Sequence, residues 1–72
     1  MTDAQLNLYV AAHNSQTAAF NAQIAGMVAE NKQREVEGNS PAYVSTHFIE
    51  ALGDYKFDLQ RLAAAYGIEV PN

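Results

Sequence analysis

The chain has 72 residues, eight acidic and four basic side chains, a formal net charge of −4 and no cysteine. A single domain of this size buries about 60% of its unfolded surface, so it is marginal when it folds alone and we expect it to self-associate. The lack of cysteine excludes a disulfide framework and a thiolate metal site, and the few basic residues predict no nucleic-acid binding. The acidic residues are scattered along the chain, which also argues against a nucleic-acid mimic.

No apolar run of about 18 residues occurs, because asparagine and glutamine side chains interrupt the N-terminal half, so no membrane span is expected. The N-terminal Met-Thr-Asp-Ala has neither a basic segment nor an apolar core, so we do not expect a signal peptide. These features predict a cytoplasmic protein.

Residues 4–31 repeat with a period of seven. Their apolar stripe, with alternating spacings of four and three, consists of Leu6, Val10, His13, Thr17, Phe20, Ile24, Met27 and Asn31. Such a period is typical of a helix that packs against another helix at a shallow left-handed crossing.

The first helix is expected over about 3–37. Thr2 and Gln5 have the spacing of a capping box, which predicts its start. The alternative is a break at His13–Ser15, where three residues have modest helix propensity. The apolar register keeps its phase across these residues, which favours one continuous helix.

No charged residue occurs between Asp3 and Glu30. Small side chains occupy the face of this helix that points away from the stripe, and they would allow a second helix to approach closely. We predict an oligomer interface that contains Ala11, Ala18, Ala22 and Ala25. The alternative is an exposed, alanine-rich surface on which glutamine and asparagine side chains contact the solvent.

A turn is expected at 38–41. Gly38 can adopt the left-handed conformation that ends a helix, while Ser40 and Pro41 are suited to cap and begin the next one. A turn this short makes the flanking helices antiparallel neighbours.

The second helix is expected over about 41–66. Its apolar stripe has the same rhythm of seven and consists of Phe48, Leu52, Tyr55, Leu59, Leu62 and Tyr66. Gly67 is placed to end it in a Schellman-type stop, which leaves a tail at 67–72. The sequence therefore predicts one all-α domain over 1–72, an antiparallel helical hairpin that self-associates into a helical bundle.

No metal, cofactor or catalytic motif stands out. His13 has no second ligand one turn away, and it is expected to be a buried polar residue that sets the register. His47 and Glu50 stand three apart, but a di-metal bundle needs this motif on two helices together with further glutamates. The chain has no phosphate loop and no nucleophile elbow, so we expect that it is not an enzyme.

Closing the hairpin would gather several side chains near the turn. From these we predict a set of contact residues: Asn31, Arg34, Tyr43, His47 and Phe48. A guanidinium beside an amide and aromatic rings suits an anionic or planar group of a partner. The alternative is that Arg34 only pairs with Glu30, while the rings cap the core. Phe57 falls on the opposite face of its helix, where an exposed ring often marks a further contact.

The spacing from Met27 through Asn31, Arg34 and Gly38 to Tyr43 and Phe48 resembles that of small uncharacterised phage-encoded helical hairpins. This resemblance implies a phage protein, located in the host cytoplasm or in the virion, that acts by binding. The expected function is neutralisation of a host factor, as in anti-defence or host takeover, by sequestration or steric blocking. The expected partners are copies of the chain and a host protein or a small anionic ligand. The alternatives are a structural subunit of a phage particle or filament, and a regulator of host transcription that acts through protein contact.

Overall fold

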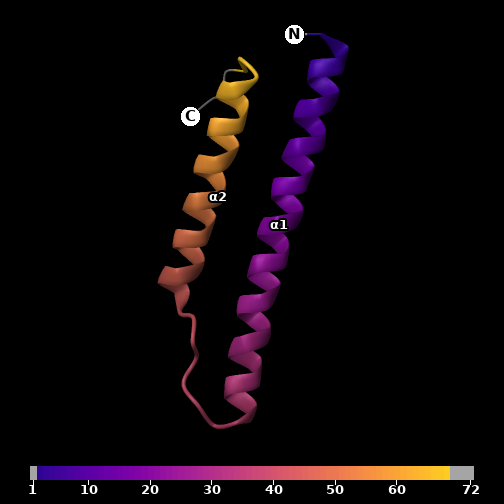
Figure 1. The fold of residues 1–72 in the computed structure, drawn as a ribbon. Helices are drawn as coiled ribbons and strands as arrows, with labels where there is room; N and C mark the ends of the chain where they lie inside the picture. The colour runs from indigo at the N-terminus through magenta and orange to yellow at the C-terminus, as the bar shows by residue number, and fades with distance from the viewer. Residues whose placement is uncertain (1, 69–72) are drawn as a thin grey trace.

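The computed structural model describes residues 2–68, which form two helices joined by one loop (Figure 1). Helix α1 spans Asp3–Val36 and helix α2 spans Ser45–Ala65. The helices lie side by side and antiparallel, and the N-terminal end of α1 extends beyond the end of α2. The predicted all-α antiparallel hairpin is confirmed, and no strand occurs among the described residues.

Helix α1 begins at the predicted capping box. The N–H of Gln5 donates to Thr2 Oγ1 at 3.1 Å, and the N–H of Thr2 donates to Gln5 Oε1 at 2.9 Å. The helix continues through His13–Ser15, so the alternative of a break there is wrong. The Thr17 hydroxyl donates to the carbonyl of His13 at 3.0 Å within this segment.

Both helices end in a Schellman motif. Gly38 has a φ of 79°, and the N–H of Asn39 donates to the carbonyl of Arg34 at 2.8 Å. Gly67 has a φ of 72°, and the N–H of Ile68 makes the equivalent bond at 2.8 Å. Each bond satisfies a carbonyl that the helix end would leave without a partner.

Two glycine substitutions should have opposite effects on stability. Gly38→Ala should lower the free energy of unfolding by about 1 kcal/mol, because a Cβ is strained in the left-handed region. Gly53→Ala should raise it by roughly 0.5–1 kcal/mol, because Gly53 is helical and an added Cβ would meet nothing within 4 Å. Thermal unfolding followed by circular dichroism measures both changes. Shifts of the melting temperature in the same direction would contradict the different backbone conformations of Gly38 and Gly53.

The predicted start of the second helix at Pro41 is wrong. Helix α2 begins at Ser45, and Val44 before it is extended, with φ −107° and ψ 175°. The predicted cap, Ser40, lies with Pro41 in a loop that runs from 37 to 44 instead of a four-residue turn.

The side chain of Asn31 explains this longer loop. Its Nδ2 donates to the carbonyl of Tyr43 at 2.8 Å, and its Oδ1 accepts from the N–H of Tyr43 at 2.9 Å. The two bonds hold Tyr43 beside α1 and use its backbone groups, so the helix begins after it. His47 Nδ1 then accepts from the N–H of Val44 at 3.0 Å, which satisfies a donor at the first turn of α2.

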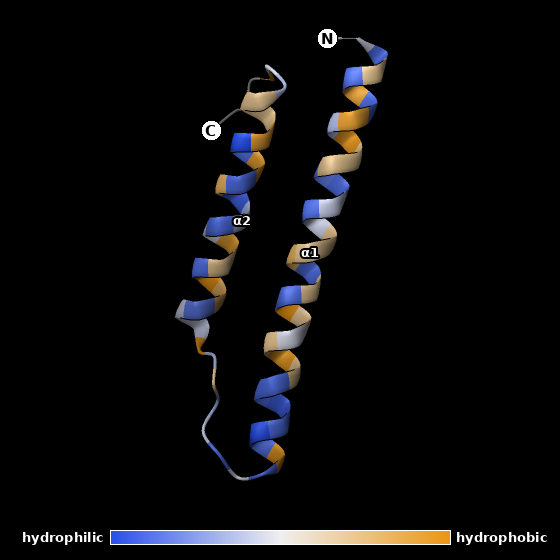
Figure 2. Cartoon of the chain, viewed as in Figure 1, coloured by the Kyte–Doolittle hydropathy of each residue, from blue (hydrophilic) through white to orange (hydrophobic). Residues whose placement is uncertain are grey.

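Aromatic side chains hold the middle of the hairpin together. The rings of Phe20 and Tyr55 stack with centroids 4.4 Å apart and an interplanar angle of 18°. The hydroxyls of Thr17 and Tyr55 lie 2.6 Å apart in a hydrogen bond that joins the helices. Figure 2 shows the apolar side of α2 turned toward α1 and its polar side turned outward.

The contact of α1 with α2 stops where α2 ends. Tyr66 meets Tyr9 edge to face, with centroids 5.6 Å apart, and Tyr9 lies 6.0 Å from the ring of His13. Figure 1 shows the start of α1 extending beyond the end of α2. Leu6, predicted in the stripe, comes before this contact and is 47% exposed. Val10, also predicted in the stripe, lies at its edge, about 100° around the helix from Tyr9, and is equally exposed.

Small residues make the closest contact on α2. Ala51 is 5% exposed and Ala63 is 0% exposed, although neither belongs to the predicted stripe. Leu52, which does belong to it, is 41% exposed. The other predicted positions of this stripe are half-buried: Phe48, Tyr55, Leu59, Leu62 and Tyr66.

The hairpin is one helix thick. Its extents are 54 × 22 × 13 Å, and the smallest of these is close to the diameter of a single helix, about 10–12 Å. Within residues 2–68, the only buried hydrophobic side chains are Met27, Ala51 and Ala63. Neither α1 nor α2 combines the length and apolar character that crossing a membrane requires.

Candidate functional site

The predicted turn cluster forms in part. The structure places Asn31, Tyr43 and His47 together, and the rings of Tyr43 and His47 meet at 88° with centroids 5.8 Å apart. Asn31 already uses its donor and its acceptor on the backbone of Tyr43. Its geometry is that of an internal clamp between α1 and the loop.

Arg34 is engaged with its own helix. Its Nε lies 3.6 Å from Oε1 of Glu30, and the two side chains are 43% and 45% exposed. An exposed pair one turn apart contributes roughly 0.3–0.5 kcal/mol. The pairing that the sequence offered as an alternative is therefore confirmed, while a ligand-binding role for Arg34 stays a prediction.

Phe57 lies away from this cluster. Its ring is 60% exposed, and the guanidinium carbon of Arg61 sits 5.9 Å from its centroid. Ten residues of helix, about 15 Å, separate it from His47. Phe48, by contrast, lies one residue from His47 and is half-buried. The structure thus does not join Phe57 to the other predicted contact residues.

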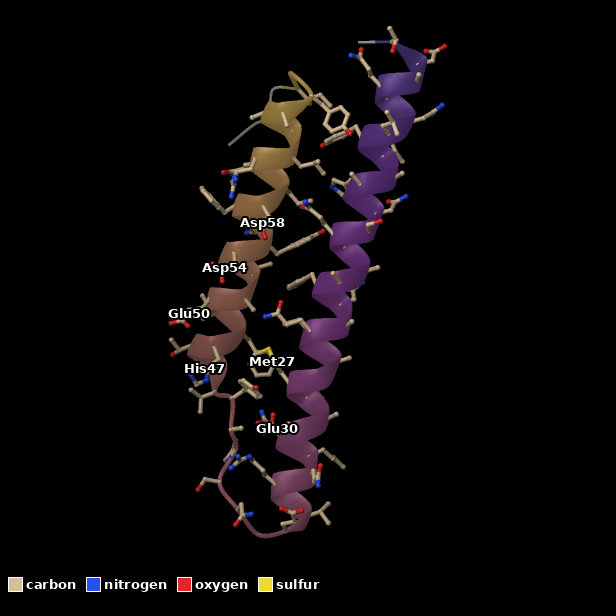
Figure 3. All side chains as sticks on the ribbon, in the orientation of Figure 1. Met27, Glu30, His47, Glu50, Asp54 and Asp58 are labelled. Carbon is tan, nitrogen blue, oxygen red and sulfur yellow. The ribbon has the colours of Figure 1, made fainter. Side chains whose placement is uncertain are left out.

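A groove runs between the helices. It consists of two adjoining hollows of about 550 and 360 Å³, which share Gln23, Ala51 and Asp54. Carboxylates line it from both helices, namely Glu30 from α1 and Glu50, Asp54 and Asp58 from α2. We call this hollow the acidic groove. Figure 3 shows its three α2 carboxylates along that helix and Met27 between the helices.

The acidic groove holds no lysine or arginine among its lining residues. Glu50, Asp54 and Asp58 stand four residues apart, so they share one face of α2. Like charges at this spacing repel each other and destabilise the helix. A positively charged partner group would relieve that repulsion.

Small and apolar side chains form the rest of the groove together with polar ones, namely Gln16, Gln23, Tyr43, His47 and Tyr55. Its α1 side presents Ala19, Ala22 and Gly26, while Met27 and Ala51, both buried, lie between the helices. Among the described residues, no three histidine, cysteine or acidic side chains are grouped so that they could hold a metal ion. The groove is suited to a side chain or helix of a protein partner.

Sequence reasoning missed the acidic groove, because it considered the acidic residues as scattered. The signal was present in the spacing of Glu50, Asp54 and Asp58. Glu30 joins them only through the antiparallel packing, which places it across from α2.

The predicted alanine interface is exposed on the hairpin. Ala11, Ala18 and Ala25 lie on the side of α1 that points away from α2, and Ala22 also reaches the edge of the acidic groove. A role of this alanine row in oligomer formation stays a prediction.

Comparisons with protein-family models, with curated proteins and with solved structures find no match to this chain.

Proposed function

We propose that the chain is a non-enzymatic binding protein whose acidic groove holds a cationic segment of a protein partner. Binding neutralises that partner by sequestration or steric blocking. The observation that carries this proposal is the groove itself, which has four carboxylates and no lysine or arginine in its lining.

The chemistry of the groove suits a basic amphipathic helix. The small residues Ala19, Ala22 and Gly26 leave room for a helix to lie close to α1. Apolar side chains of such a helix would contact Met27 and Ala51, while lysine or arginine would pair with the α2 carboxylates, since Glu30 already faces Arg34. Complementary charge would speed association and reject acidic partners.

The contacts near the turn favour a cationic partner over a small anionic ligand. Asn31 is used by the Tyr43 backbone and Arg34 faces Glu30, so these two groups are already engaged within the chain. The resemblance to phage-encoded hairpins would make the partner a host protein and the role anti-defence or host takeover.

Charge reversal in the groove tests the proposal. The double variant Asp54→Lys/Asp58→Lys should bind a synthetic amphipathic helix of lysine and leucine at least about tenfold more weakly than the parent chain. Isothermal calorimetry at low and high salt measures the affinity, and the parent's affinity should fall as salt rises.

The matched control is Glu35→Lys/Glu37→Lys, which makes the same change in net charge outside the groove. This control should bind the peptide nearly as well as the parent. Equal weakening in both variants would mean that only net charge matters, which would contradict a groove site. A natural partner should bind the parent and Glu35→Lys/Glu37→Lys. It should not bind Asp54→Lys/Asp58→Lys.

A structural subunit of a particle or filament is the second candidate function. The exposed alanine row on α1 favours it, because contact surfaces on different sides of one subunit can produce open-ended assembly. Light scattering over a range of concentrations separates the candidates. Growth of the mass without limit would support the subunit, and one fixed mass would reject it.

A further inference from the structure

The face of the hairpin opposite the acidic groove carries exposed apolar side chains on both helices. Side chains turn by about 100° per residue around a helix, which places Val28 about 160° from Gly26, a groove residue, and Ile49 about 140° from Asp54. Four large hydrophobic side chains share this opposite face and are 41–68% exposed: Val10, Val28, Ile49 and Leu52. We call this set the apolar face.

The amount of exposed surface calls for a covering partner. The chain has an accessible surface of 5438 Å², whereas a compact monomer of its mass, 7.8 kDa, exposes about 4,400 Å². The excess, roughly 1,000 Å², is close to the area that each partner buries in a stable protein interface, about 800 Å².

The shape of the hairpin leads to the same conclusion. Its radius of gyration is 16.2 Å, against about 11 Å for a compact domain of this length. Stable domains have at least two packed layers of secondary structure, and this hairpin supplies one. A second hairpin laid on the apolar face would supply the missing layer.

The charges select the apolar face for contact between copies. Two chains meeting at the acidic groove would bring Glu30, Glu50, Asp54 and Asp58 of each copy together, at a cost in repulsion. In a dimer formed through the apolar face, these carboxylates point away from the other copy. The α1 half of the apolar face contains no charged residue from Val10 to Val28, and its α2 half carries Lys56, about 20° around the helix from Ile49.

We propose that two copies of the chain pack through their apolar faces into a four-helix bundle. The contact is isologous, because each copy supplies the same surface. The acidic groove of each copy then stays open on the outside of the dimer. The inference does not depend on what the groove binds, so the two proposals can fail separately.

A single charge at the apolar face tests the dimer. Val28→Glu should convert a particle of twice the chain mass into a monomer or an unfolded chain at micromolar concentration, as measured by light scattering. The matched control is Val36→Glu, since Val36 is 79% exposed and lies on the outer side of α1, away from the apolar face. The control should keep the dimer mass.

A milder variant covers the case in which Val28→Glu does not fold. Val28→Ala should raise the concentration at which half of the dimer dissociates by roughly tenfold, because two copies each lose buried apolar area. The melting temperature of the parent should also rise with protein concentration. A parent of monomer mass with a concentration-independent melting temperature would overturn the proposal, as would equal effects of the two glutamate variants.

Discussion

Met27→Ala should lower the free energy of unfolding by about 2–4 kcal/mol. Met27 is 7% exposed and is the one large side chain that is buried among residues 2–68. Its truncation removes apolar contacts and leaves a cavity between the helices, which accounts for an effect of this size. A domain of this length has a total stability of roughly 4–10 kcal/mol, so the variant should be close to unfolding.

Urea denaturation followed by circular dichroism measures this loss. Val36→Ala serves as the control, because Val36 is 79% exposed and its truncation should cost under about 0.5 kcal/mol. If the two variants lost the same small amount, Met27 would not be at the centre of the packing.

Asn31→Ala should lower the free energy of unfolding by about 1.5–3 kcal/mol. It removes two hydrogen bonds and leaves the N–H and the carbonyl of Tyr43 without these partners in a half-buried position. The exchange rate of the Tyr43 amide proton, measured by NMR, should rise in the variant. Asn14→Ala, an exposed site on the same helix, should leave that rate unchanged.

Asn31→Asp separates the two bonds of the clamp. Aspartate can still accept from the N–H of Tyr43, but it cannot donate to the carbonyl. The free energy of unfolding of Asn31→Asp should therefore lie between that of the parent and that of Asn31→Ala. A loss of unfolding free energy as large as that of Asn31→Ala would mean that the bond from Nδ2 contributes most of the stabilisation.

Local signals in the sequence were enough for the helices and their ends. The period of seven predicted two helices that pack together, Thr2 and Gln5 predicted the start of α1, and Gly38 and Gly67 predicted the two stops. All of these depend on residues within about one or two turns of each other. Backbone geometry over so short a distance follows from the residue types alone.

Longer-range contacts account for the parts that were predicted wrongly. Ser40 and Pro41 form a good helix start by local rules, yet α2 begins at Ser45. The reason is Asn31, twelve residues before Tyr43, whose side chain holds the loop in place. No local preference near Pro41 carries information about that contact.

The same distinction applies to the surfaces that matter for function. The spacing of Glu50, Asp54 and Asp58 is visible in the chain, but the groove exists only because antiparallel packing sets Glu30 and Met27 against α2. Likewise, Leu6 and Phe20 belong to one periodic stripe, and the point where α2 ends leaves Leu6 47% exposed. Periodicity assigns a residue to a face of its own helix. Whether that face is covered depends on the length and position of the other helix, which is a property of the packed hairpin.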